Sequence, residues 1–287
     1  MITVTAATGH FGRLVIDELL ERGVPADQIV AAVRTPEKAT DLAGRGIQVR
    51  EADYDNPATL ASAFNGVERL LFISSSEFGR QAEQHAGVVR AAKEAGATAL
   101  IYTSYLNADS SGIAMAEPHA RTEELIRASG IPYAILRNGS YIENYTANIR
   151  MWLQYGTIIG SAGDGKISGA TRADLAAAAA SVAAGEPVDN RVYELGGTAF
   201  TMNDLATETT AQTGTTVTYT DMPPAEYSQT LASVGLPQFL TDAIADNSAG
   251  AARGGWYTAS RELQNLLGRP TTAVKEAVAQ ALAQHQS

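Results

Sequence analysis

The stretch Val4-Thr5-Ala6-Ala7-Thr8-Gly9-His10-Phe11-Gly12 lies where the first apolar run of the chain gives way to a helical pattern. The run Ile2–Thr5 is short and rich in β-branched residues, which favour strands. Apolar side chains then recur at three- and four-residue spacing from Phe11 to Glu21, which favours a helix. The two glycines let the backbone turn tightly and let the helix pack closely on the strand. This stretch therefore predicts a strand, a glycine turn and a helix.

The same alternation continues to about residue 139. Further strands are predicted at Ile29–Val33, Gln48–Glu51, Arg69–Ile73, Ala99–Thr103 and Tyr133–Leu136. Helices are predicted between them at Pro36–Ala43, Pro57–Ala63, Gln81–Glu94 and Pro118–Ala128. Because each crossover between parallel strands needs a helix, this pattern predicts a parallel sheet covered on both faces. The fold class is α/β, with a Rossmann-type doubly wound sheet over residues 1–139.

The rhythm changes after residue 139. Short strands are predicted at Thr157–Gly160, Arg191–Leu195 and Val217–Tyr219. Helices are predicted at Ala173–Ala184, Met202–Thr213, Pro224–Val234, Pro237–Asn247 and Thr271–Gln284. No linker rich in Pro, Ser or Gly precedes this part, so residues 140–287 are expected to form a smaller mixed α/β lobe that covers a substrate. Some of its segments are expected to pack back on the core.

Composition and charge exclude several classes of function. The 287 residues include 45% hydrophobic and 18% charged residues, as in globular proteins. A net charge of −10 argues against a nucleic-acid partner, which clustered Lys and Arg would bind. There is no cysteine, and the histidines have no metal-ligand spacing, so we expect no disulfide and no metal site. No signal peptide or membrane span is recognisable, so a cytoplasmic protein without a membrane partner is expected.

The turn has the chemistry of a dinucleotide site. Backbone amides and the positive end of the helix dipole favour a pyrophosphate at this point. The spacing is that of a G-x-x-G-x-x-G turn in which Ala6 replaces the first glycine. A positive φ at Ala6 would be strained, whereas a negative φ would leave the site intact. A plain tight turn is the alternative, but the position in the first βα unit favours dinucleotide binding.

The end of the second predicted strand distinguishes the two nicotinamide cofactors. An acid there would bond the ribose hydroxyls of NAD, but the strand ends in Arg34, with Lys38 one turn further. A guanidinium can clamp a 2′-phosphate through charge-assisted bonds, so NADP(H) is the expected cofactor. A solvated loop arginine is the alternative.

Other strand ends should meet the same cofactor, because ligands bind at the carboxyl edge of such sheets. Asp53 follows the third strand and is placed to flank an adenine, and Ser74, Ser75 and Ser76 follow the fourth. The sixth strand runs into Arg137-Asn138-Gly139 and then Ser140–Tyr145, which should border the nicotinamide and the substrate. A purely structural loop is the alternative for this last segment.

These residues resemble a known family. The TxxTGxxG-like turn, Val33–Lys38, Ala52-Asp53-Tyr54 and Ser74–Glu77 are similar to the NmrA-like atypical short-chain dehydrogenases/reductases. The resemblance continues through Leu136–Gly139, Ile142–Tyr145, Ala162–Ile167 and Ala170–Asp174, and so covers nearly the whole chain. Within the family it is closest to the bacterial NAD(P)H:quinone oxidoreductases. It implies cofactor contacts at Ala6, Ala7, Thr8, Gly9, His10, Phe11, Arg34, Ser74, Ser75, Ser76, Asn138, Gly139, Tyr141, Glu143 and Arg172.

The sequence departs from ordinary short-chain dehydrogenases in its catalytic groups. No Tyr-x-x-x-Lys pair occurs, so the usual phenolic acid is missing. His119 falls where the lysine would align and Met115 where the tyrosine would. Tyr141 and Asn144, with Tyr145 beside them, are candidates for the catalytic pocket. His119 is a candidate proton donor or ribose contact on the expectation that its pKa suits neutral pH, with a surface histidine as the alternative.

Three functions fit these observations. A quinone accepts hydride readily and needs mainly orientation, which favours an NADPH-dependent quinone oxidoreductase. The second is an NADPH-dependent ketone or carbonyl reductase, with Tyr141, His119 or water as the acid. The third is a non-catalytic NADP(H) redox sensor. A small-molecule quinone or carbonyl is the expected partner, and assembly as a homodimer is left open.

Overall fold

A parallel sheet of seven strands forms the centre of the computed structural model, which describes residues 1–284. The strand order is β3-β2-β1-β4-β5-β6-β8, and every neighbouring pair is parallel. The strands are β1 Ile2–Thr5, β2 Ile29–Val33, β3 Gln48–Glu51, β4 Arg69–Phe72, β5 Ala99–Tyr105, β6 Tyr133–Asn138 and β8 Arg191–Leu195. The order reverses between β1 and β4, which is where a doubly wound sheet opens a crevice for a ligand.

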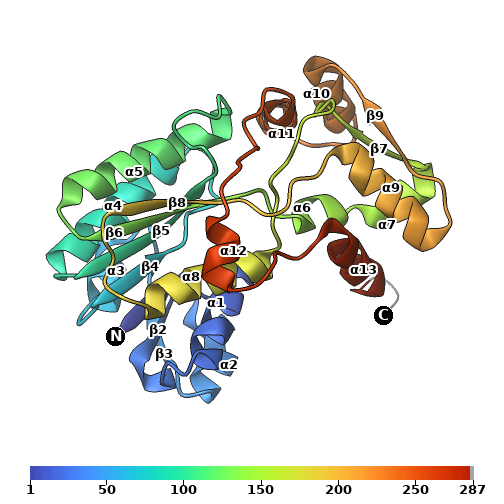
Figure 1. Cartoon of the computed structure of the whole chain (residues 1–287). Helices are drawn as coiled ribbons and strands as arrows, with labels where there is room; N and C mark the ends of the chain where they lie inside the picture. The colour runs from blue at the N-terminus through green and yellow to red at the C-terminus, as the bar shows by residue number, and fades with distance from the viewer. Residues whose placement is uncertain (285–287) are drawn as a thin grey trace.

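Helices cover both faces of this sheet, as Figure 1 shows for α1 and α8 on one side and α4 and α5 on the other. The first face carries α1 His10–Glu21, α2 Thr40–Gly44, α8 Arg172–Ala184 and α12 Glu262–Leu267. The second carries α3 Pro57–Ala63, α4 Gln81–Glu94 and α5 Glu117–Ser129. Because both faces are covered, a central strand such as β2 is apolar and buried at every position. The predicted doubly wound α/β fold is confirmed.

A smaller region lies to one side of the sheet (Figure 1). Its two-stranded parallel sheet pairs β7 Thr157–Gly160 with β9 Thr218–Asp221. Its helices are α6 Glu143–Thr146, α7 Ile149–Tyr155, α9 Met202–Thr213, α10 Pro224–Ser233, α11 Gln238–Ala252 and α13 Val274–Gln284. Trp152, Phe200 and Leu205 belong to a separate apolar cluster in this region.

The structure corrects several sequence-based expectations. Arg191–Leu195, grouped above with the smaller region, is the seventh strand of the main sheet and pairs with β6. The predicted helix Pro36–Ala43 is a 3₁₀ turn at Pro36–Ala39 followed by α2. The short helices α6, α7 and α12 were not anticipated, because segments of four to seven residues give too little periodicity to recognise. Across residues 1–284, no helix is both long and apolar enough to cross a membrane.

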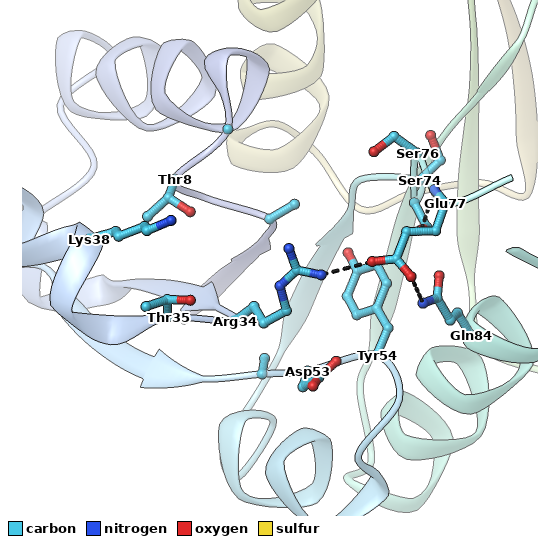
Figure 2. Close-up of a pocket in the computed structure, with 14 residues that line it drawn as sticks. Thr8, Arg34, Thr35, Lys38, Asp53, Tyr54, Ser74, Ser76, Glu77 and Gln84 are labelled. Carbon is cyan, nitrogen blue, oxygen red and sulfur yellow. Dashed lines mark hydrogen bonds and ion pairs between the residues drawn. The ribbon is translucent and has the colours of Figure 1, made fainter. Parts of the chain in front are cut away.

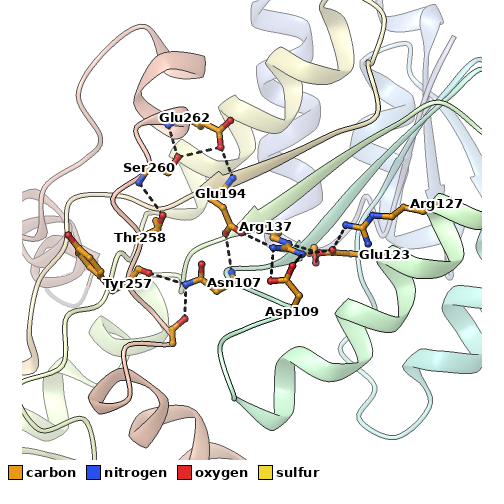
Figure 3. Close-up of polar contacts among 12 residues, drawn as sticks. Asn107, Asp109, Glu123, Arg127, Arg137, Glu194, Tyr257, Thr258, Ser260 and Glu262 are labelled. Atoms are coloured by element: carbon orange, nitrogen blue, oxygen red, sulfur yellow. Dashed lines mark hydrogen bonds and ion pairs between the residues drawn. The ribbon is translucent and has the colours of Figure 1, made fainter.

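A buried cluster of charged side chains joins α5, β6 and β8 (Figure 3). Arg137 donates to both carboxylate oxygens of Glu123, at 2.8 and 2.7 Å, and to Glu194 at 2.8 Å. Burial alone would lower the pKa of Arg137, but its bonds to these carboxylates and to Asp109 raise it overall. Asn107 donates its backbone amide to Glu194 Oε2 at 3.0 Å, and its side-chain amide donates to the carbonyls of Gly255 and Tyr257, at 3.1 and 3.0 Å. These bonds link the end of β5 to the segment that follows α11.

Candidate functional site

The turn after β1 has the close backbone approach that its glycines predict. Gly9 donates its amide to the carbonyl of Ala6 at 3.0 Å. A Cβ at Gly12 would lie 2.5 Å from that same carbonyl oxygen, so only glycine fits there. Ala6 has a φ of 49°, which is the strained alternative raised by the sequence. The turn therefore keeps the glycine conformation at position 6 even though alanine occupies it.

A cavity of about 320 Å³ opens beside this turn, within the range of small-molecule sites (Figure 2). Its walls come from the loops that follow β1, β2, β3 and β4, at the carboxyl edge of the sheet. The predicted site residues that line it are Ala6, Thr8, Gly9, Arg34, Asp53, Ser74, Ser75 and Ser76. The remaining lining residues are Thr35, Lys38, Ala52, Tyr54, Glu77 and Gln84.

Basic groups gather at the β2 side of the cavity. Arg34 and Lys38 both line it, and the Arg34 side chain is 68% exposed. Figure 2 shows the Arg34 guanidinium directed across the cavity towards Glu77, with an Nη1–Oε1 distance of 2.8 Å. One wall of the cavity thus carries two cations, Arg34 and Lys38. Arg34 already bonds the carboxylate of Glu77, which comes from the opposite wall.

The floor of the cavity is fixed by Tyr54. Its hydroxyl donates to the carbonyl of Ile73 at 2.7 Å and bonds Thr5. Burial raises the pKa of Tyr54 well above its ordinary value, so the hydroxyl stays protonated and keeps donating. The ends of β1, β3 and β4 are therefore held together under the cavity.

A second group of predicted residues lies beside Phe11, at the start of α1. The Arg172 guanidinium sits 4.6 Å from the centroid of the Tyr141 ring and donates to Asn144 Oδ1 at 2.6 Å. Glu143 accepts the backbone amide of Arg172 at 2.8 Å. The Tyr141 ring lies 5.9 Å from that of Phe11 on α1, measured between centroids. The structure thus brings Tyr141, Glu143, Asn144 and Arg172 together beside the start of α1.

Tyr141 is an unactivated phenol. Burial raises its pKa to about 12, and the nearby charge of Arg172 only partly opposes this effect. The hydroxyl is therefore protonated at neutral pH, in contrast to a tyrosine whose pKa a lysine lowers. It can donate a hydrogen bond but is a weak acid.

His119 lies in the interior rather than in the cavity. It is 9% exposed, and its Nδ1 is 2.9 Å from the Tyr102 hydroxyl. Burial lowers its pKa to about 4, so it is neutral at pH 7. The expectation that its pKa suits neutral pH is wrong, because the apolar surroundings of α5 penalise the charged ring. The alternative that His119 is a surface histidine is also wrong, because its side chain is buried.

The other predicted contacts differ in their exposure. Ala7, Phe11, Asn138 and Gly139 are buried, whereas His10 is exposed at the start of α1. A Cβ at Gly139 would lie 2.3 Å from the carbonyl oxygen of Ser168, so this glycine is needed for backbone packing. None of these five residues lines the cavity.

Sequence reasoning missed Glu77 and Gln84 as parts of the site. Glu77 ends the Ser74–Glu77 run, which carries part of the family resemblance. Gln84 lies in the first turn of α4, where nothing in a single sequence distinguishes it from a solvated side chain. Their positions depend on how α4 meets the β4 loop, which the strand pattern does not specify.

Comparisons with known proteins agree with this geometry. The chain matches the NAD(P)H-binding family over residues 6–186. It is 50% identical over 279 residues to quinone oxidoreductase 2 of Escherichia coli (strain K12), covering 97% of each chain.

Two solved structures are also similar. The NADPH complex of the E. coli NADPH-dependent quinone oxidoreductase has a TM-score of 0.96 and 49% identity, covering 98% of this chain and 100% of that one. The NADP(H) complex of a Citrobacter sp. triphenylmethane reductase has a TM-score of 0.93 and 38% identity, covering 98% and 100%. The chain therefore belongs to the NAD(P)H-binding family and is a relative of quinone oxidoreductase 2.

Proposed function

We propose that this protein is an NADPH-dependent quinone oxidoreductase. The proposal is supported by the cavity at the glycine turn, by the basic residues on one wall of that cavity and by the similarity to quinone oxidoreductase 2. NADP(H) supplies the hydride when bound. The residues of this chain then have to hold it, orient an acceptor and limit access of water.

The two halves of the site fit the two ends of this cofactor. Arg34 and Lys38 would hold a 2′-phosphate, and the amides at the start of α1 would face the pyrophosphate. Near the start of α1, Asn138 Oδ1 and Glu143 Oε2 are buried acceptors without a hydrogen bond, and Glu143 Oε2 lies 3.7 Å from Arg172 Nη1. Buried acceptors normally have a donor, and the amide group of a nicotinamide would supply one. We propose that the other residues predicted to contact the cofactor bind it in this same orientation.

The unactivated Tyr141 is the observation that favours a quinone over a ketone. A ketone reduced by hydride becomes a strongly basic alkoxide, which calls for a matched acid. A reduced quinone is a phenolate-like anion that water can protonate. With a pKa of about 12, Tyr141 is suited to orienting an acceptor by hydrogen bonding rather than to rapid proton transfer. Asn144 can assist through Nδ2, because its Oδ1 is bonded to Arg172.

The lobe and the location complete the proposal. We assign residues 1–139 to cofactor binding and residues 140–287 to a lobe that covers the substrate, with β8, α8 and α12 packing on the core. A cytoplasmic location and the lack of a nucleic-acid partner stay predictions, and assembly as a homodimer stays open.

Replacement of Tyr141 by phenylalanine tests the proposed chemistry. With a benzoquinone as acceptor, Tyr141→Phe should keep kcat within about fivefold of wild type, since general-acid catalysis by this group would be worth about 10²-fold or more. The matched control is Tyr145→Phe, a neighbouring tyrosine whose pKa burial also raises to about 12. A hundredfold loss of quinone turnover in Tyr141→Phe alone would show that Tyr141 is an essential acid.

Measuring which acceptor oxidises NADPH distinguishes the alternative functions. An aryl ketone reduced faster than any quinone would favour a carbonyl reductase. Tight NADPH binding with no oxidation by either acceptor would favour a redox sensor.

A further inference from the structure

An ion pair crosses the cavity between two loops of the sheet edge. Arg34 follows β2 and Glu77 follows β4, and Figure 2 shows the two side chains directed at each other across the cavity. Their Nη1–Oε1 distance is 2.8 Å. The guanidinium proposed to bind a 2′-phosphate therefore has a carboxylate partner within the protein.

The carboxylate of Glu77 is held in position on its far side. Its Oε2 accepts from Gln84 Nε2 at 3.0 Å and lies 3.8 Å from Arg80 Nη1. The backbone amide of Glu77 donates to Ser75 Oγ at 3.1 Å. These contacts leave Oε1 directed into the cavity (Figure 2).

The loop that carries Glu77 is anchored from α4. His85 Nε2 accepts the amide of Ser75 at 2.9 Å, and Gln81 donates to the Ser75 carbonyl at 2.7 Å. Burial lowers the pKa of His85 to about 3, so its Nε2 keeps the lone pair that this bond requires. Two buried side chains thus hold the backbone of Ser75, two residues before Glu77.

We propose that Glu77 is a specificity-determining residue that limits the preference for NADPH over NADH by competing with the 2′-phosphate for Arg34. The inference rests on the proposed NADPH function. A guanidinium that bonds a carboxylate gains less from a phosphate, and the negative carboxylate also repels the phosphate. NADH has no 2′-phosphate, so it neither gains from Arg34 in this way nor meets the repulsion.

Charge removal at position 77 is the test. Dissociation constants for NADPH and NADH are measured for wild type, Glu77→Gln and Glu77→Ala. Both variants should bind NADPH about two- to fivefold more tightly, as expected for an exposed pair with side chains 68% and 37% exposed, and NADH no more tightly. The gain should shrink in about 1 M salt, which screens the competing charges.

The matched control is Glu83→Gln, an exposed glutamate on α4 that does not line the cavity. It should leave both constants unchanged. Unchanged or weaker NADPH binding in both Glu77 variants would overturn the proposal while the NADPH function stands. Failure of wild type to bind NADPH would instead refute the proposed function.

Discussion

At the scale of single residues, Ala6 shows how a strained backbone is retained beside a ligand site. Its φ of 49° places an alanine where glycine has no steric penalty. The left-handed conformation costs an L-residue roughly 1–2 kcal/mol, whereas glycine loses about 0.4–1 kcal/mol through a freer unfolded chain. The backbone strain at Ala6 is therefore larger than the entropic loss that a glycine would bring.

Ala6→Gly should therefore raise the free energy of unfolding by up to about 1 kcal/mol, measured by urea denaturation. The neighbour Ala7 is fully buried and has an ordinary φ. Ala7→Gly should lower the same quantity by about 1 kcal/mol, through lost packing and greater chain entropy. Equal destabilisation by both changes would contradict the strain assigned to Ala6.

Sequence reasoning at this scale succeeded where a residue type has one clear use. Arg34 and the three serines after β4 could be placed at the cavity because strand ends share one edge of the sheet. His119 could not be placed, because its burial depends on the packing of Tyr102 and Tyr105 around α5. The pKa of a histidine follows from that packing and not from its position in a motif.

At the scale of elements, the buried ion pair between Arg137 on β6 and Glu123 on α5 joins two elements of the core. Arg137 is 7% exposed and Glu123 1% exposed, whereas Arg121 and Glu117 form an ion pair with both side chains 63% exposed. Arg137→Met leaves a buried carboxylate without its main partner. We expect it to lower the free energy of unfolding by about 3 kcal/mol or more.

The control for that change is Arg121→Met, which breaks the exposed pair and should cost at most about 1 kcal/mol. Adding Glu123→Gln to Arg137→Met should recover part of the loss, because it removes the unpaired charge. Thermal or urea unfolding measures all three variants. Equal losses for the two arginine variants would mean that burial does not strengthen this pair.

Long periodic elements were predictable and short ones were not. The predicted bounds of β1, β2, β3, α3 and α4 are the bounds observed in the structure. The helices α6 and α7 span four and seven residues, too few for a repeating pattern. The place of β8 at the sheet edge is set by pairing with β6, across more than fifty residues of sequence, so local patterns could not show it.

At the scale of the whole molecule, the parallel sheet brings two sets of side chains to its carboxyl edge, near the glycine turn. The set after β2, β3 and β4 lines the cavity with Arg34, and the set after β6 carries Tyr141 and Arg172. A dinucleotide that spans the turn would connect them. We propose that the first set selects NADPH and that the second presents a quinone to it.

The most direct test is the ratio of kcat/KM with NADPH to that with NADH, measured anaerobically with a benzoquinone as acceptor. We expect one hydroquinone per NADPH oxidised and a preference for NADPH of at least about tenfold, because a hydrogen bond to a charged group contributes about this much. Arg34→Ala should lose most of that preference, while Arg45→Ala, which breaks an exposed pair with Asp17 outside the cavity, should keep it. NADPH that binds but is not oxidised by the quinone, or equal rates with NADH in wild type, would contradict the account.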